Sequence, residues 1–168
     1  SRASHPPRGR RGALRQWRDA SRHLVAWQGR RLSYTLPSGI SIEVSSASDW
    51  AVYNEVFVEG EYDVPIRKVI ENAADNPLIV DLGANVGYFS LRFADLWTRH
   101  RGAKAPFRVM SVEGCPRTYE QLRIRLQQPS LAGRCLPSFG LAGARTGEAT
   151  ISTSVATGLN SIHGHRSL

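Results

Sequence analysis

The stretch "LIVDLGANVGYFSLRF", residues 78–93, decides the fold class. Its first five residues have the apolar character of a strand, with the acid Asp81 near the end, and its second half has the period of an amphipathic helix. Gly83 and Gly87 lie between these elements, where they allow a sharp turn and a close approach of the backbone to a ligand. This order predicts the first unit of an α/β protein.

The chain after Pro77 repeats the pattern of strand and helix. We expect strands at 78–82, 107–113 and 134–139, and helices at 86–98 and 116–127. Such alternation predicts a parallel sheet buried on both faces by flanking helices. The ligand site of such a sheet lies at the carboxyl ends of its strands, where "DLGAN" and "SVEG" are found.

Residues 32–76 follow a different pattern. "RLSYTLPSGISIEV" alternates on both sides of a Pro-Ser-Gly turn and predicts a hairpin. A helix capped by Ser48 or Asp49 then ends near Gly60, and a second helix covers 65 to about 73. We interpret these elements as a preamble, or lid, that lies against the main sheet.

The net charge of +8 resides in residues 1–31, which contain nine arginines and one acid, Asp19. The remaining basic and acidic residues balance, thirteen against thirteen. We expect residues 1–12 to be disordered and residues 13–28 to form a basic amphipathic helix that docks on its own domain or a partner. Nucleic acid or anionic membrane contact, a transit-peptide-like segment and a mistaken gene start are the alternatives.

Composition excludes several classes of protein. A chain of 168 residues with 41% hydrophobic content suits one globular domain and a tail. No apolar run approaches the roughly 18 residues that a membrane span requires. Two cysteines, Cys115 and Cys135, are too few for a disulfide scaffold or a paired-thiol metal site. We therefore expect a soluble cytoplasmic protein with reduced thiols and no metal centre.

The loop after the first strand differs from a dinucleotide loop. A G-x-G-x-x-G fingerprint cannot be laid over Gly83 and Gly87. The carboxylate of Asp81 would repel a pyrophosphate and attract an ammonium group, while Glu113, at the end of the next strand, suits a ribose diol. S-adenosylmethionine contains both an amino acid moiety and a ribose.

The pattern D-x-G-A-N-x-G-Y-x-S, from Asp81 to Ser90, resembles the first motif of the FkbM family of S-adenosylmethionine-dependent methyltransferases. Other segments resemble family motifs in the same order: "VYNEVFVEGEYDVP", "VMSVEGCPRTYEQLRIRL", "GLAGARTGEATIS" and "GLNSI". The resemblance covers about residues 49–162. The order of five local matches is more specific than any one of them.

The resemblance implies a Rossmann-like class I methyltransferase fold that uses S-adenosyl-L-methionine for O-methylation of a hydroxyl on a sugar, polyketide or related metabolite. It identifies no catalytic residue. The alternatives to cofactor binding are that the glycines serve only the turn and that Tyr62 is a core residue. Loop chemistry and resemblance together give these cofactor-binding candidates: Tyr62, Asp81, Gly83, Ala84, Asn85, Gly87, Tyr88, Glu113, Gly114, Phe139 and Gly140.

The resemblance also predicts an incomplete fold. Methyltransferases of this class build a seven-stranded sheet in the order 3-2-1-4-5-7-6, whereas this chain has the third strand and a hairpin but no fourth strand. We expect a tail at 1–31, a preamble at 32–76 and the cofactor-binding part of a methyltransferase domain at 77–168. The first strand would then be an apolar edge that a hairpin, a partner or a second copy covers.

Three other functions stay open from the sequence. The chain could be a cofactor-binding fragment without catalysis, a nucleotide-dependent oxidoreductase, or an RNA-binding module that uses its arginine-rich tail. We expect a small-molecule or glycan acceptor and no nucleic acid partner.

Overall fold

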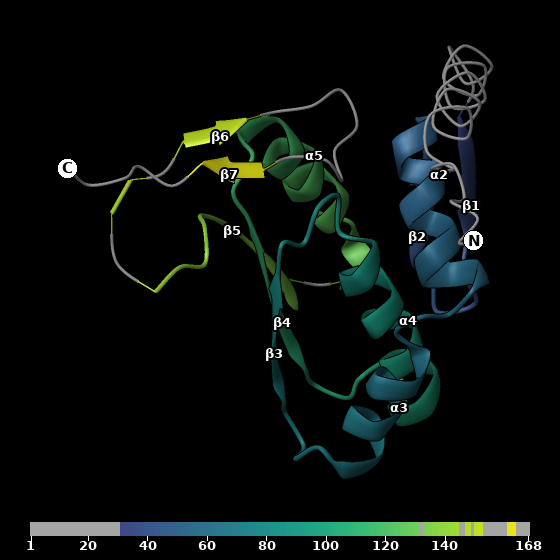
Figure 1. The fold of residues 1–168 in the computed structure, drawn as a ribbon. Coiled ribbons are helices and arrows are strands. Elements are labelled where there is room, and N and C mark those ends of the chain that lie inside the picture. The colour runs from purple at the N-terminus through teal and green to yellow at the C-terminus, as the bar shows by residue number, and fades with distance from the viewer. Residues whose placement is uncertain (1–30, 132, 145–146, 149, 153–160, 164–168) are drawn as a thin grey trace, which may run out of the picture.

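The computed structural model describes residues 31–131, 133–144, 147–148, 150–152 and 161–163 (Figure 1). The predicted tail with its amphipathic helix, at 1–30, lies outside the described residues, as does the Asn160 side of the "GLNSI" match.

A three-stranded parallel sheet forms the centre of the fold. Its strands are β3 (Leu78–Leu82), β4 (Arg108–Glu113) and β5 (Cys135–Phe139), in the order β3-β4-β5. Helix α4 (Tyr88–Arg101) connects β3 to β4, and α5 (Pro116–Leu126) connects β4 to β5. The predicted α/β class, with helices flanking a parallel sheet, is confirmed.

The ends of α4 differ from the prediction because glycines set them. The helix begins at Tyr88 and not at residue 86, since Gly87 has a φ of 92°, in the left-handed region. It ends at Arg101, where Gly102 follows with a φ of 94°. Three basic residues in its last turn complement the negative end of the helix dipole.

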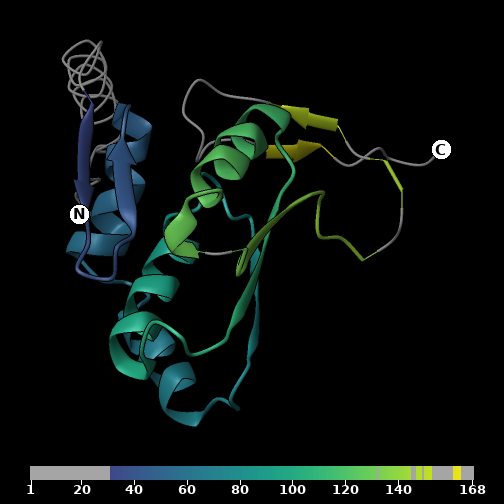
Figure 2. The ribbon, with the colours of Figure 1, turned by 180° about the vertical axis from the view of Figure 1, so that it is seen from behind.

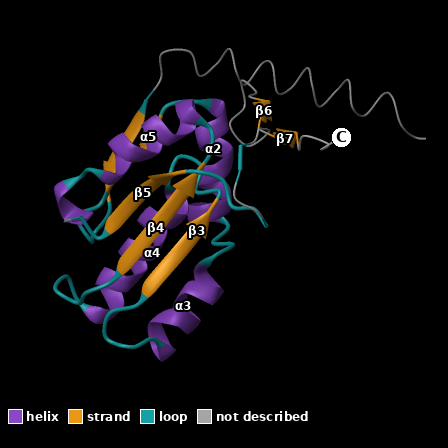
Figure 3. Cartoon of the chain, turned by 90° about the vertical axis from the view of Figure 1, so that its left-hand side faces the viewer, coloured by secondary structure: helices purple, strands orange, loops and turns teal. Residues whose placement is uncertain are grey.

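The two faces of the sheet differ in their covering. Helices α4 and α5 lie on one face, and Figure 3 views the sheet from the other, with the strands in front. On that side apolar side chains in the described part of the chain are exposed by 38 to 60%. They are Leu78, Val80, Leu82, Met110 and Leu136. The expectation that both faces are buried is therefore wrong for the described residues, where the helices lie on a single face.

The edge of the sheet at β3 matches the prediction. Among the described strands, β3 pairs only with β4, from Leu78 opposite Arg108 to Leu82 opposite Val112. The backbone groups along the other edge of β3 therefore have no neighbouring strand in the described residues.

An aromatic cluster fills the space between the covered face and α4. Phe93 and Trp97, one turn apart on α4, meet Phe107 with ring centroids 5.6 to 5.9 Å apart. All three side chains are buried. Burial of three large rings contributes much of the stability of this layer, at roughly 1.5–3 kcal/mol for each side chain.

The preamble takes the predicted form. Strands β1 (Leu32–Thr35) and β2 (Ser41–Val44) pair antiparallel. Helix α2 (Ala47–Tyr53) continues into the π-helical turn η1 (Asn54–Val58), and α3 (Asp63–Asn72) follows. Figure 2 shows the hairpin and α2, in purple and blue, on the helix side of the sheet.

The first preamble helix is capped by Ser46, so the prediction of Ser48 or Asp49 is wrong. The Ser46 hydroxyl accepts a hydrogen bond from the Asp49 amide at 3.0 Å. The Asp49 carboxylate reaches back and accepts bonds from the amide and hydroxyl of Ser45 at 3.1 and 2.9 Å. Asp49 therefore occupies the third helical position of a reciprocal cap.

Arg125 of α5 joins the preamble to the sheet layer. Its guanidinium donates to the carbonyls of Val86 and Glu43 at 2.8 and 3.1 Å and lies 3.4 Å from the Asp49 carboxylate. It also stacks over the Tyr88 ring, 4.6 Å from the centroid. One side chain thus holds the hairpin, α2 and the loop before α4 together.

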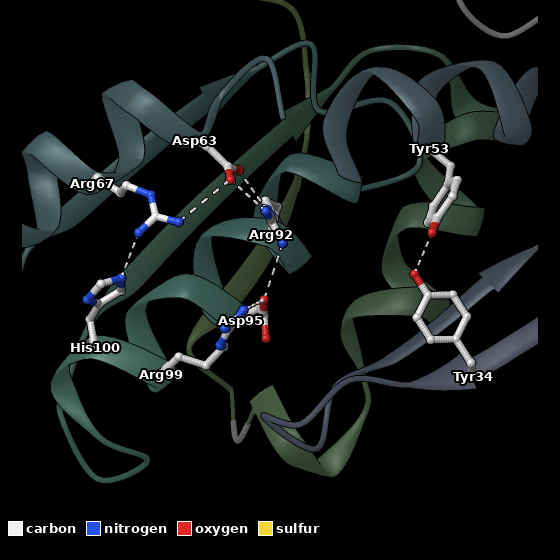
Figure 4. A network of polar contacts seen from close by, with 8 residues as sticks. All are labelled: Tyr34, Tyr53, Asp63, Arg67, Arg92, Asp95, Arg99 and His100. Atoms are coloured by element: carbon white, nitrogen blue, oxygen red, sulfur yellow. Dashed lines mark hydrogen bonds and ion pairs between the residues drawn. The ribbon is translucent and has the colours of Figure 1, made fainter. Parts of the chain in front are cut away.

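A second ionic network joins α3 to α4 (Figure 4). Arg92 donates two hydrogen bonds to the Asp63 carboxylate, at 2.8 and 2.6 Å, and contacts Asp95 at 3.4 Å. This bidentate pair holds the pKa of Asp63 below its ordinary value. Arg67 and Arg99 extend the network at longer range.

The remaining elements are small. A short 3-10 turn, η2 (Pro129–Leu131), precedes β5, and β6 (Thr150–Ser152) pairs antiparallel with β7 (Ser161–His163). Cys115 and Cys135 are free and buried. None of the helices in the described ranges has the length and apolar character to span a bilayer, and no group of metal-ligating side chains gathers within those ranges.

Candidate functional site

A cavity of about 650 Å³ lies where the carboxyl end of β3 meets α2 and η1. This volume falls within the roughly 300–1,000 Å³ that is typical of small-molecule sites. Its lining residues come from the preamble, the β3 edge and the loop before α4: Ser48, Ala51, Val52, Glu55, Val56, Tyr62, Val80, Asp81, Leu82, Gly83, Ala84, Asn85, Tyr88 and Phe89. Two of them are acids and none is basic.

Asp81 is the more buried of the two acids. The Ser90 hydroxyl, in the first turn of α4, donates to its carboxylate at 3.3 Å and also bonds the buried Ser111 hydroxyl at 2.7 Å. Burial raises the pKa of Asp81 to about 6, with a further rise from Glu113, while the Ser90 bond opposes the shift. A cation in the pocket would favour the charged carboxylate.

The loop after β3 leaves room in front of its backbone. Gly83 has a φ of 79°, and a Cβ there would meet no atom within 4 Å. Asn85 is the only residue other than glycine with a positive φ in the described chain, at 49°. Asparagine is among the few residues that tolerate this conformation. Its side-chain oxygen is buried and has no partner among the described residues.

The amide groups of this loop are largely occupied. Gly83 and Ala84 both donate to the Val112 carbonyl at 2.9 Å, Asn85 donates to Glu113, and Gly87 donates to the Ala84 carbonyl. A phosphate cradle requires several backbone N–H groups that point at the ligand. The amides of Gly83, Ala84, Asn85 and Gly87 are therefore already bonded within the protein.

Glu113 lies at the end of β4 and fastens two loops. One carboxylate oxygen accepts from the Asn85 amide at 3.0 Å, and the other accepts from the Cys115 amide at 2.8 Å. Each oxygen has a second lone pair, so the carboxylate can still accept hydrogen bonds from a ligand. Glu113 does not line the cavity itself.

At two of the candidate positions, close packing explains why the residue is glycine. A Cβ on Gly87 would lie 2.7 Å from the Leu122 side chain of α5, and one on Gly114 would lie 2.2 Å from that of Leu141. Neither residue lines the cavity. These glycines let α5 and the segment after β5 approach the β3 and β4 loops closely.

Tyr88 lines the cavity with a fully engaged side chain. Its hydroxyl donates to the Glu43 carbonyl at 2.7 Å, and its ring meets the rings of Tyr53 and Phe57 edge-on. Burial raises the pKa of its hydroxyl well above the ordinary value. The residue supports the pocket wall and ties it to the hairpin.

Phe139 and Gly140 lie at the carboxyl end of β5, outside the cavity lining. The Phe139 ring packs against Tyr119 of α5 at 5.3 Å, and the Gly140 amide donates to the Glu113 carbonyl at 3.1 Å. Both residues thus neighbour Glu113 and not Asp81.

The pocket also includes residues that sequence reasoning did not single out. Its helical wall consists of Ser48, Ala51, Val52, Glu55 and Val56, to which Phe89 of α4 is added. The sequence predicted this helix but not which of its side chains face the cavity. Tyr62, 38% exposed, completes the rim and packs edge-on against Phe89.

The arrangement suits a cation that also has apolar and hydroxyl groups. Two acids, an unpartnered amide oxygen and several apolar side chains line one cavity, and no lysine, arginine or histidine does. His100 lies outside this lining, in the last turn of α4, with its Nε2 atom 3.2 Å from Arg67. No residue within the cavity lining has the position and chemistry of a general base other than the two carboxylates.

Comparisons with known proteins found a distant likeness to a solved structure. No family model matches the sequence, and no curated protein matches it significantly. A crystal structure of a protein from Pyrococcus horikoshii, described provisionally as a transferase, matches 66% of this chain at 16% sequence identity and a TM-score of 0.41. The chain spans 36% of the length of that structure. A likeness at this level identifies neither a family nor an activity.

Proposed function

We propose that this chain binds S-adenosylmethionine and is the cofactor-binding part of a methyltransferase. One observation carries the proposal: the cavity at the carboxyl end of β3 has two carboxylates and no basic side chain in its lining, and the amides of Gly83, Ala84 and Asn85 beside it are already bonded. These features disfavour a phosphate ligand and favour a cationic one. The resemblance of residues 81–90 to the FkbM motif supports the same ligand.

The residues present fit this cofactor. The buried, unpartnered oxygen of Asn85 and the open space in front of Gly83 are features that a ligand would fill. Asp81 would hold the ammonium group, and Glu113 would accept hydrogen bonds from the ribose hydroxyls. When bound, S-adenosylmethionine supplies an activated methyl group on a sulfonium.

The protein's contribution to such a reaction is alignment and exclusion of water. Phe89, Val56 and Val52 present apolar surface to the cavity, which removes water from a bound ligand. We propose a hydroxyl of a small molecule or glycan as the acceptor, in line with the family that the motifs resemble. The role of a base in deprotonating it is assigned to no residue.

Isothermal titration calorimetry with S-adenosylhomocysteine tests this proposal on the full chain. We expect saturable binding of one ligand per chain, and a higher melting temperature in its presence. Asp81→Asn should weaken binding strongly, while Asp75→Asn, outside the cavity lining, should leave it unchanged. Binding of NAD without binding of S-adenosylhomocysteine would contradict the proposal and favour an oxidoreductase.

A further inference from the structure

The helical wall of the cavity runs from α2 into the π-helical turn η1. This turn interrupts the helical geometry after α2, between Asn54 and Val58. A wider turn shifts the direction of the side chains it carries, and such turns are frequent at functional sites. Here Glu55 and Val56 line the cavity, while Phe57 stacks on Tyr53. Glu55 follows Ala51 by four residues and Val52 by three, so it lies on the helical face that they share and adds a carboxylate to the cavity wall.

Glu55 has no cationic partner in the part of the chain that the structure describes. Within the described residues it forms no ion pair, although six arginines are engaged in ion pairs elsewhere in that part of the chain. Its neighbours in the cavity wall, Ala51 and Val52, are apolar and short. A carboxylate over an apolar wall, without a basic side chain in the lining, can be neutralised by a ligand cation.

Glu55 and Asp81 line the same cavity from different elements of the fold. Asp81 comes from the β3 end and Glu55 from the helical wall, and both line one cavity. The negative charges of both acids affect the Tyr62 hydroxyl. Burial raises its pKa, and the charges of Glu61, Glu55 and Asp81 raise it further. Two separate carboxylates in the lining of one cavity fit a ligand with two positive centres.

We propose that Glu55 lies beside the sulfonium of the bound ligand, and that it makes the pocket favour S-adenosylmethionine over S-adenosylhomocysteine. The inference rests on the function proposed above. The two ligands differ by one methyl group and one positive charge, and they share the ammonium group that Asp81 would hold. A carboxylate near the sulfonium therefore stabilises only the methyl donor, which favours exchange of the demethylated product for new donor.

Calorimetric affinities of both ligands for the full chain test the proposal. In Glu55→Gln we expect the affinity for S-adenosylmethionine to fall about fivefold, the size of one partly solvated charge contact, and that for S-adenosylhomocysteine to fall less than about twofold. Glu59→Gln is the matched control: it removes the same charge at the end of the same turn, from a residue outside the cavity lining. It should change neither affinity by more than about twofold.

The possible results separate the two proposals. Equal weakening of both ligands in Glu55→Gln, or none, overturns the role of Glu55 while leaving the cofactor assignment intact. Wild-type protein that binds neither ligand overturns the proposed function and this inference with it. The melting temperature of each ligand-free variant should equal that of the wild type, because both glutamates are exposed.

Discussion

The backbone amide of Asn85 donates a 3.0 Å hydrogen bond to the carboxylate of Glu113, so the loop after β3 is fastened to the end of β4. The other oxygen of the same carboxylate holds the Cys115 amide at the start of α5. Glu113 thus shapes the pocket from outside its lining. The side chain that suits a ribose diol is also the one that fixes the loop.

Replacing Glu113 should destabilise the protein before any ligand is added. Glu113→Gln leaves one oxygen for two backbone amides, so one N–H loses its partner, at about 1–3 kcal/mol of unfolding free energy. Urea unfolding measures this. Glu120→Gln, at an exposed position bonded to Arg123, serves as the control and should change the free energy of unfolding much less than Glu113→Gln does. Equal stability of both variants would show that the two loops do not depend on Glu113.

Asn85 allows its backbone and side-chain roles to be separated. Asn85→Gly keeps the left-handed φ of 49° without strain, whereas Asn85→Ala should lose about 1 kcal/mol of stability. Both remove the buried oxygen that has no partner in the described chain. If the ligand bonds this oxygen, both variants should bind S-adenosylhomocysteine about tenfold more weakly. Unchanged affinity in the glycine variant would contradict that contact.

Asp81 should stabilise binding and destabilise folding. Its pKa in the folded chain is about 6, above the ordinary value of 3.8, so the fold favours the protonated form. This contribution is fully present below pH 3.8 and is lost as the pH rises through 6. At pH 7.5 the ligand-free Asp81→Asn variant should therefore be more stable than the wild type, by about 2–3 kcal/mol, with little difference at pH 3.5.

Chemical denaturation at the two pH values, with and without S-adenosylhomocysteine, checks this prediction. The asparagine variant should gain stability without ligand and lose the stabilisation that ligand gives to the wild type. A variant that is less stable than the wild type at pH 7.5 would contradict the charge-burial account of Asp81.

The two loop glycines should respond differently to the same substitution. Alanine at either position costs about 1–2 kcal/mol, because both have a positive φ. Gly87→Ala should cost roughly 1–3 kcal/mol more, since its Cβ would overlap the Leu122 side chain. Gly83→Ala places its Cβ in open space within the cavity, so it should chiefly weaken ligand binding. Thermal unfolding and calorimetry together distinguish the two patterns.

The elements with strong periodicity were predictable from the sequence. The hairpin, the β3–α4–β4–α5–β5 order and the edge position of the first strand follow from the spacing of apolar residues and turns. The cap at Ser46 was not, because Ser45, Ser46 and Ser48 are all suitable capping residues within four positions and the hydrogen bonds of Asp49 decide between them.

The site was predictable only in part. The positions of Asp81, Gly83 and Asn85 in the cavity lining follow from their place between a strand and a helix. The contribution of Glu55 depends on which face of α2 and η1 meets the β3 edge, a tertiary contact that the helical period alone does not reveal. The packing roles of Gly87 and Gly114 depend on Leu122 and Leu141, contacts that no local pattern reveals.

The sheet adds its strands in the order in which the ribosome makes them. Each of β4 and β5 pairs with the strand that precedes it in the sequence. No later strand of the described sheet has to insert between two earlier ones. We expect the chain to fold stepwise during synthesis, with the loop around Asn85 gaining protection once Glu113 has emerged. Limited proteolysis of stalled nascent chains that expose residues up to Leu126, compared with chains that expose only α4, measures this directly; equal cleavage of the loop in both would exclude it.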